Sequence, residues 1–496
     1  MLSAGSVGSW IVREASRKGP AVGRHKNGHG KRLSHAGTIF GQLGDHMARR
    51  GGPRGAGLVL LALASIVFAV GIVSCEPIRA RVDEDARPLT LEPDIRVRVR
   101  SRLSATTLAS AAASGALNAR ILPSGVPTSL RSPVQVTISP RGLATKDASG
   151  VVRDWGNGID VEISVPGVAA DRTTLSMDGA AYPGVMTLRG KWRETLPTFD
   201  VVCAMPMEIY IPGVLQKELY DGWPRQTYEA QAIAARSYAM HERDRSRRGG
   251  KLWDVESTTL DQAFGGLATR IAAIDAGRNT RGMILTSGGG GVLRAYYSSC
   301  CGGRPATAAA IWPTKAGFEF NLSPPLQGQP REFACQAAPV FAWEVVRKSD
   351  ELSRRMRAWG RDAGHRVQAV DRLRAVEIAA RNTAGRPNSY KVTDIRGQEY
   401  RIGAEEMRLA CNFGVPGAGT TPGQEALADI RSGPAHVKSN DLEFIVVGTE
   451  VRIKGRGFGH GVGMCQFCAK GFAERGKDAT EMLGFFYPGA RVVRSY

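Results

Sequence analysis

Glu218 is the residue whose surroundings most clearly suit acid chemistry. Its neighbours in the sequence are largely apolar: Val214, Leu215, Leu219, Tyr220 and Trp223. If the fold brings these side chains around the carboxyl, they disfavour its ionised form and raise its pKa, so that the group stays protonated near neutral pH. We therefore take Glu218 as the candidate acid. Glu208 and Asp221 are the alternatives, and a surface carboxylate without a chemical role is the competing interpretation.

A second group with its own chemistry consists of five cysteines: Cys300, Cys301, Cys335, Cys465 and Cys468. Four of them could supply thiolates to a zinc ion, and Cys465-x-x-Cys468 has the spacing of half a zinc knuckle. A second CxxC pair is missing. Disulfides, such as Cys300 or Cys301 to Cys335, suit an exported protein at least as well. We place structural disulfides ahead of a structural zinc ion, and we expect no cofactor that a reaction would require.

A helix must lie shortly after Glu218. Small residues recur at spacings of three and four at Ala232, Ala235 and Ala239, which allows close backbone packing and predicts a buried helix from Thr227 to about Arg245. Thr227 is the expected N-cap. Before this helix, residues 199–211 predict a strand that ends in a turn at Pro212-Gly213.

The part of the chain before these elements is rich in short β-type runs. Ile95, Val97 and Val99 alternate with arginines, as in a strand with one solvated face. Further runs cover residues 134–139, 151–155, 159–165 and 185–188. We expect an α+β protein, with a small β-rich N-terminal part at 93–184 and a mixed helix and strand domain at 185–496.

The N-terminus carries an unusual excess of positive charge. Residues 1–56 hold ten Lys and Arg against Glu14 and Asp45, with no apolar period, which predicts a basic disordered leader. A shorter product starting at Met47 would have an ordinary signal-peptide layout. In this alternative, translation starts at Met47 and the leader before it is untranslated.

Residues 57–74 are eighteen residues without a charge, preceded by arginines and followed by Cys75. This length indicates an export signal or a membrane anchor, and the preceding arginines predict that the rest of the chain is exported. The ending Ile72-Val73-Ser74-Cys75 resembles the lipobox of bacterial lipoproteins, which implies lipidation at Cys75; an uncleaved anchor is the alternative. Residues 76–92 read as a linker. We expect a membrane-tethered protein of the cell envelope, on the outer face of the cytoplasmic membrane or in the periplasm.

The charge also bears on partners. Of the net charge of +20, residues 1–56 supply +8, which leaves +12 on the remainder. Such an excess suits anionic wall polymers or lipid headgroups. We expect no nucleic-acid partner, because the chain is exported and shows no helix-turn-helix, finger or aromatic RNA-binding signature.

Three segments of the chain share a family pattern: YIPGVLQKELYDGWPRQTYEAQAIAARSYA (210–239), AYYSSCCGG (295–303) and GRGFGHGVGMCQFCAKG (455–471). Together, and in this order, they resemble the stage II sporulation protein D family, with its SpoIID/LytB domain. The resemblance covers roughly Val185–Tyr496 and implies that this part is a catalytic domain with a substrate cleft.

The resemblance implies a peptidoglycan lytic transglycosylase. In that family a glutamate shortly before the alanine-rich helix is the catalytic acid, and the matching residue is Glu218. The family wording there is close to Ser-Glu-Met-Pro, whereas this chain has two or three extra residues before Pro224. Ordinary glycosidases need two carboxylates. A lytic transglycosylase manages with one, because the 6-hydroxyl of the muramic sugar attacks the anomeric carbon and an anhydro-muramic end forms.

The resemblance also implies substrate-binding residues: Gln231, Arg236, Tyr238, Tyr297, His460 and Gln466. Arg236 would meet a carboxylate or hydroxyl of the sugar, or would instead be a structural arginine. Tyr296 and Tyr297 would stack on sugar rings, or would belong to the core, as aromatic residues on strands more often do. His460 would orient substrate or bind metal; a turn histidine bonded to the backbone is the competing interpretation.

Two other functions compete with catalysis. The family also includes non-catalytic amidase enhancers, which would keep a sugar-binding cleft without needing Glu218, and the domain would otherwise be a wall-binding or structural lipoprotein. The expected partners are peptidoglycan glycan strands, a cell-wall amidase, and the membrane through the N-terminal segment. In one form of the hypothesis, the amidase has already removed the stem peptides from the glycan strands.

Overall fold

The computed structural model describes residues 91–110, 115–168, 174–192, 196–328, 332–414 and 436–496. The predicted leader, the segment at 57–75 with Cys75, and nearly all of the linker lie outside the described residues. Among the residues that are described, no helix combines the length and the apolar character needed to cross a bilayer.

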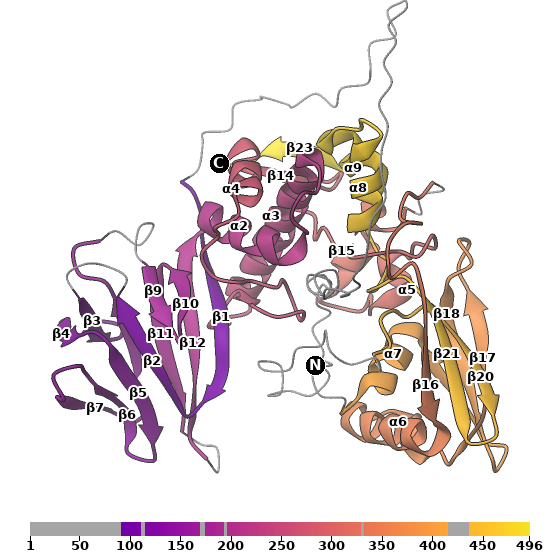
Figure 1. The fold of residues 1–496 in the computed structure, drawn as a ribbon, viewed down its shortest axis with the longest axis horizontal. Helices are drawn as coiled ribbons and strands as arrows, with labels where there is room; N and C mark the ends of the chain where they lie inside the picture. The colour runs from indigo at the N-terminus through magenta and orange to yellow at the C-terminus, as the bar shows by residue number, and fades with distance from the viewer. Residues whose placement is uncertain (1–90, 111–114, 169–173, 193–195, 329–331, 415–435) are drawn as a thin grey trace, which may run out of the picture. The chain divides into compact units, whose positions relative to one another are not determined.

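Two sheets form from the strands of the first half of this region (Figure 1). The seven-stranded sheet has the order β13-β1-β12-β11-β8-β3-β4, and the six-stranded sheet has the order β10-β9-β2-β5-β6-β7. The strands are β1 (Asp94–Leu103), β2 (Ala105–Ser110), β3 (Ala116–Ile121), β4 (Thr128–Arg131), β5 (Val134–Ser139), β6 (Gly142–Lys146), β7 (Val152–Gly156), β8 (Asp160–Ser164), β9 (Thr174–Met177), β10 (Ala180–Pro183), β11 (Val185–Lys191), β12 (Thr198–Pro206) and β13 (Val255–Glu256).

Strand β1 confirms the alternation seen in the sequence, because Ile95, Val97 and Val99 are all buried. The expected boundary between residues 184 and 185 falls inside the seven-stranded sheet, since β11 pairs with both β8 and β12. The strands before and after that position therefore share one hydrophobic core.

The segment after β12 corrects a prediction. The strand expected over residues 199–211 ends at Pro206, and Pro212 and Gly213 lie inside the helix α2 (Met207–Glu218) rather than in a turn. The buried side chains of α2 include Tyr210, Ile211, Val214 and Leu215, spaced as on one helix face. Packing of this face outweighs the low helix propensity of Pro and Gly. Gly213 is also needed for close approach, because a Cβ there would lie 2.4 Å from the Phe264 ring.

The buried helix predicted from Thr227 is present as α3 (Arg225–Arg248), and Ala232, Ala235 and Ala239 are fully buried in it. Its start differs from the prediction. Pro224, with ψ of 142°, stands at the N-cap, so Thr227 lies inside the first turn. Proline suits the start of a helix because the first backbone N–H groups have no partner within the helix.

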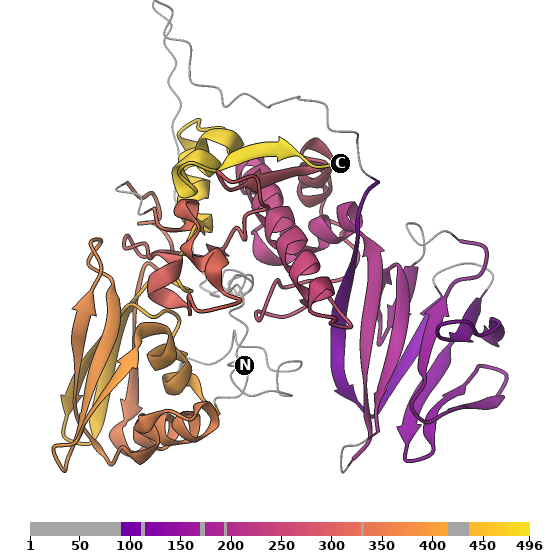
Figure 2. The same cartoon turned by 180° about the vertical axis from the view of Figure 1, so that it is seen from behind.

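Helix α3 is the central element of the region that follows. It contacts α2, α4, α8, α9 and β14, and Figure 2 shows it beside the antiparallel pair β14 and β23. The elements are α4 (Ile271–Asn279), β14 (Met283–Thr286), β15 (Tyr297–Ser298), α5 (Ala308–Ile311), η1 (Glu319–Leu322), η2 (Pro324–Leu326), β22 (Met464–Cys465), α8 (Gln466–Glu474), α9 (Ala479–Phe486) and β23 (Arg491–Arg494). Because α3 packs against both α2 and α8, the C-terminal end of α2 and the N-terminal end of α8 meet beside it.

A separate core lies between β15 and β22 in the sequence. It comprises two three-stranded sheets, β16-β21-β20 and β17-β18-β19, with α6 and α7 packed against them. The bounds are β16 (Ala342–Lys348), α6 (Ser349–Ala363), η3 (Arg366–Ala369), β17 (Leu373–Arg381), β18 (Pro387–Asp394), β19 (Glu399–Gly403), α7 (Ala404–Asn412), β20 (Leu442–Val447) and β21 (Glu450–Arg456). The described chain is thus a mixed α and β protein.

Candidate active site

Glu218 is the last residue of α2 and only 3% of it is exposed. Burial raises the pKa of its carboxyl to about 7, against smaller lowering effects from hydrogen bonds of the Gln466 side chain and the Ala263 backbone. Among the described residues, its Oε1 has no hydrogen bond of ordinary geometry. The apolar setting predicted from the sequence is present, since Val214, Leu215 and Leu219 are fully buried. Such a carboxyl can hold a proton near neutral pH and give it to a bound group.

Two glutamines share the space next to this carboxyl. Gln466 Nε2 donates to Glu218 Oε2 at 3.1 Å and lies 3.4 Å from Gln231 Oε1. Gln231 comes from the second turn of α3 and Gln466 from the first position of α8, and both are buried. The structure therefore brings together three of the predicted site residues. The Gln466 amide favours the ionised carboxylate, because it is a hydrogen-bond donor.

An aromatic cluster of Tyr220, Trp223 and Phe467 adjoins these residues in the sequence. The ring centroids are 5.2 Å apart for Tyr220 and Trp223, 5.0 Å for Trp223 and Phe467, and 6.0 Å for Tyr220 and Phe467. All three side chains are half-buried. Tyr220 and Trp223 belong to the segment in which the chain departs from the family wording, and Phe467 follows Gln466 directly. Partly exposed aromatic rings offer flat apolar faces on which sugar rings can stack.

Arg236 is a structural arginine in this arrangement. It is fully buried, its guanidinium binds both carboxylate oxygens of Glu208 at 2.9 and 2.8 Å, and it also donates to the Met283 carbonyl. Glu208, one alternative acid, is thereby held in an ion pair and accepts a further hydrogen bond from Tyr496. The other alternative, Asp221, has a side chain that is 84% exposed. Of the three carboxylates considered, Glu218 alone combines burial with the absence of a cationic partner.

The tyrosines expected near the substrate lie in the core. Tyr238 donates to Asp261 at 3.0 Å, and Tyr297 accepts from Gln262 at 2.9 Å. Tyr296 is also fully buried and stacks on Trp312, with ring centroids 4.0 Å apart. Tyr296 and Tyr297 match the core alternative rather than sugar stacking, and Tyr238, predicted to bind substrate, is also fully buried.

His460 matches the alternative of a turn histidine. Its Nδ1 accepts a hydrogen bond from the backbone N–H of Val462 at 3.0 Å, and Trp312 and Tyr296 pack against its ring. Burial lowers its pKa to about 3, so the imidazole is neutral. Among the described residues, no hydrogen bond joins His460 to Glu218.

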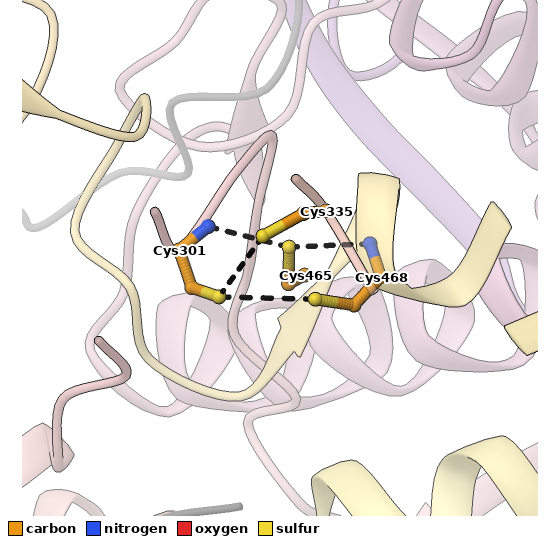
Figure 3. Close-up of side chains that lie close together, drawn as sticks. All are labelled: Cys301, Cys335, Cys465 and Cys468. Carbon is orange, nitrogen blue, oxygen red and sulfur yellow. Dashed lines mark hydrogen bonds between the residues drawn. The ribbon is translucent and has the colours of Figure 1, made fainter. Parts of the chain in front are cut away.

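The described cysteines form no disulfide. The Sγ atoms of Cys301 and Cys335 are 3.6 Å apart, well beyond an S–S bond of about 2.05 Å, so the expected bridge to Cys335 is absent from the structure. Instead, four sulfur atoms converge, those of Cys301, Cys335, Cys465 and Cys468 (Figure 3). Cys300 is outside this group.

Comparison with known proteins assigns the region around Glu218. Residues 197–287 match the family model SpoIID, described as Stage II sporulation protein. This segment is similar to the SpoIID domain. The resemblance noted in the sequence is thereby confirmed. The SpoIID domain includes Glu218 and Gln231, whereas Gln466 and the cysteine cluster lie beyond the matched residues.

Individual relatives match different parts of the chain. An uncharacterised protein of Brachyspira hyodysenteriae is 27% identical over 297 residues, which cover 60% of this chain and 69% of the relative. The "Amidase enhancer" of Bacillus subtilis is 23% identical over 376 residues, and the match spans about half, 48%, of that relative's length. The "Stage II sporulation protein D" of Bacillus amyloliquefaciens is 39% identical over 56 residues, which are 11% of this chain and 16% of the relative.

Sequence reasoning missed one residue of the site beside the SpoIID domain. Phe467 was not singled out, although it stands between Gln466 and Cys468 in a segment that was. Tyr220 and Trp223 were noted only as apolar neighbours of Glu218. Each of the three aromatic residues follows a candidate site residue closely in the sequence: Tyr220 and Trp223 come two and five positions after Glu218, and Phe467 comes directly after Gln466. No local sequence rule marks such a spacing as a binding surface.

Proposed function

We propose that this protein is a peptidoglycan lytic transglycosylase in which Glu218 acts first as general acid and then as general base. One observation carries the proposal: a buried carboxyl with a pKa of about 7 and without a cationic partner lies in the segment that matches the SpoIID family, and it accepts a hydrogen bond from Gln466, the residue before the half-buried Phe467. A single such group suffices for this reaction, since no water molecule has to be activated.

In the proposed reaction, protonated Glu218 gives its proton to the glycosidic oxygen as the bond to the anomeric carbon breaks. The 6-hydroxyl oxygen of the same muramic sugar bonds to that carbon and releases its proton to the Glu218 carboxylate. The acid is thus regenerated and the new end is an anhydro-muramic sugar. Gln466 stabilises the carboxylate between the two proton transfers, because it donates to Oε2. The half-buried rings of Tyr220, Trp223 and Phe467 would offer apolar faces on which a sugar ring can stack.

The test uses purified protein and glycan strands with and without stem peptides, with products identified by mass spectrometry. We expect anhydro-muramic ends from the wild type and none from Glu218→Gln. A preference for peptide-free strands would assign the protein a place after an amidase. Intact strands after incubation with a folded protein that binds them would refute the transglycosylase.

A second candidate is a non-catalytic amidase enhancer, and the 3% exposure of Glu218 favours it. In addition, a pocket of the described chain is lined by residues such as Trp343, Arg381 and Arg456, and Glu218 is not among its lining residues. A relative bears the name amidase enhancer. An enhancer would raise the rate of a purified wall amidase on whole peptidoglycan, and the Glu218→Gln variant would do so equally well.

We also propose that the protein acts at the cell envelope, tethered through residues 57–75 and lipidated at Cys75. The support is the uncharged stretch of eighteen residues that ends at this cysteine. Labelling of cells with a radioactive fatty acid tests it: the wild type should carry the label and Cys75→Ala should not. An unlabelled wild type that remains with the membrane would indicate an uncleaved anchor.

A further inference from the structure

Four cysteines from three separate segments converge at one buried point. Cys301 follows β15, Cys335 lies before β16, and Cys465 and Cys468 span the junction of β22 and α8. Their Sγ atoms all lie within 4.8 Å of one another, with 3.6 Å between Cys301 and Cys335 and 3.8 Å between Cys301 and Cys468. A tetrahedral zinc ion with Zn–S bonds of about 2.3 Å separates its sulfur ligands by about 3.8 Å. The spacing fits a tetrathiolate metal site and not a pair of disulfides.

Backbone amides point at the same sulfur atoms (Figure 3). The N–H of Cys301 donates to Cys465 Sγ at 3.2 Å, the N–H of Cys468 donates to the same atom at 3.4 Å, and that of Ala334 donates to Cys468 Sγ at 3.4 Å. Donors of this kind stabilise negative charge on sulfur and orient metal ligands. They favour thiolates over thiols at this point.

The turn after Cys301 is shaped to keep the site closed. Gly302 has φ of +65°, and a Cβ there would lie 2.7 Å from the backbone nitrogen of Gly457. Only glycine fits both the left-handed conformation and this close approach. The turn therefore holds Cys301 against Cys465, next to the parallel pairing of Ser298 with Cys465.

We propose that Cys301, Cys335, Cys465 and Cys468 bind one Zn²⁺ ion, and that this ion fixes the turn that carries Gln466 and Phe467 to Glu218. Four protein thiolates fill the tetrahedral coordination of zinc, so the site is structural and has no open position for substrate. The preference for zinc follows from four soft ligands in tetrahedral spacing.

The coupling to Glu218 follows from the sequence of the CxxC turn. Gln466 and Phe467 are the two residues between the ligands Cys465 and Cys468, so a metal that holds both ends fixes the two residues between them. Gln466 then donates to Glu218, and Phe467 packs 5.0 Å from Trp223. This second part of the inference rests on the proposed function, whereas binding of the ion does not.

Metal content and thiol counting test the site without any assay of glycan cleavage. Full-length protein purified without reductant should contain one zinc per chain by mass spectrometry. A mercurial reagent should release that zinc as four thiols react. Cys335→Ser and Cys468→Ser should lose the metal, whereas Cys203→Ser and Cys411→Ser, which change buried cysteines outside the cluster, should keep it. If the serine variants do not fold, Cys335→His should restore zinc binding, because histidine is also a zinc ligand.

Tryptophan fluorescence tests the coupling. Removal of zinc from the wild type should shift the emission, because Phe467 no longer packs against Trp223, and the shift should be much smaller in Trp223→Phe. Folded protein with disulfides among the four cysteines, or with iron at one per chain, would overturn the zinc site. One zinc per chain together with inactivity of the wild type on glycans would uphold the site and reject the transglycosylase. An unchanged emission spectrum after zinc release would overturn the coupling.

Discussion

Gln466 donates a hydrogen bond of 3.1 Å to Glu218 across a separation of 248 residues in the sequence. This bond favours the ionised carboxyl, whereas burial favours the protonated form. Burial has the larger effect, so the pKa is raised to about 7. A carboxyl balanced in this way exchanges its proton within the ordinary working range of pH, which is the property that acid and base catalysis requires.

The amide replacement Glu218→Gln keeps the size of the side chain and removes its proton chemistry. We expect the rate of glycan cleavage to fall by at least about 100-fold, the lower range for loss of a general acid. The rate is measured by chromatography of anhydro-muramic products. Asp221→Asn, at the exposed neighbouring carboxylate, is the matched control and should keep the wild-type rate; an equal loss in both variants would speak against Glu218 as the acid.

The rate should also depend on pH with a defined sign. The acid must be protonated, and its pKa is raised to about 7, so kcat/KM should decline as the pH rises through about 7. The profile is measured from pH 5 to 9 at constant ionic strength. A rate that stays level up to pH 9 would place the acid elsewhere.

The same shift should appear in stability. An unfolded glutamate ionises near pH 4.5, whereas folded Glu218 keeps its proton up to about pH 7. The folded state therefore binds more protons between these values, and the unfolding free energy declines as pH rises through this window and stays lower above it. The loss amounts to about 3 kcal/mol for a shift of this size. Denaturant unfolding at pH 4.5 and pH 8 measures it, and Glu218→Gln should lack this component.

Replacement of Gln466 tests the hydrogen bond itself. In Gln466→Leu the carboxyl loses a donor that lowers its pKa, so the alkaline limit of the pH profile should move upward. A variant that only disturbs packing would lose rate at every pH without moving this limit. Gln398→Leu, at an exposed glutamine in the turn between β18 and β19, serves as the control.

The ion pair of Arg236 and Glu208 should matter for stability rather than for substrate. Arg236→Met leaves the Glu208 carboxylate, whose side chain is 10% exposed, without its cationic partner, which costs about 3 to 5 kcal/mol in buried pairs. Thermal and denaturant unfolding measure the loss. Arg278→Met breaks an exposed pair with Asp275 and should leave stability near that of the wild type. A stable Arg236→Met protein with impaired glycan binding would return Arg236 to the substrate site.

Local patterns in the sequence predicted the elements whose burial repeats along the chain. The alternation at Ile95, Val97 and Val99 identified β1, and the spacing of Ala232, Ala235 and Ala239 identified α3. Both patterns reflect one buried face, which sequence periodicity reports directly.

Two features had no local signal. Pro212 and Gly213 favour a turn by propensity, yet the burial of α2 against its neighbours keeps them helical. Cys335 is more than thirty residues from Cys301 and more than one hundred from Cys465, and nothing in its own neighbourhood indicates that the three meet. The contact of Gln466 with Glu218 is of the same kind: the family pattern marked both residues, but only the packing of α8 on α3 brings them together.

The family-matched segment at 197–287 carries Glu218 but ends well before the CxxC turn. A protein fragment cut to those boundaries would keep Glu218 and Trp223 and would lose Gln466, Phe467 and all four clustered cysteines. It would expose the face of α3 on which α8 and α9 pack. The smallest unit able to reproduce the site is therefore set by long-range contacts, and screening of truncated libraries around the matched segment alone would report inactivity for a reason unrelated to the acid.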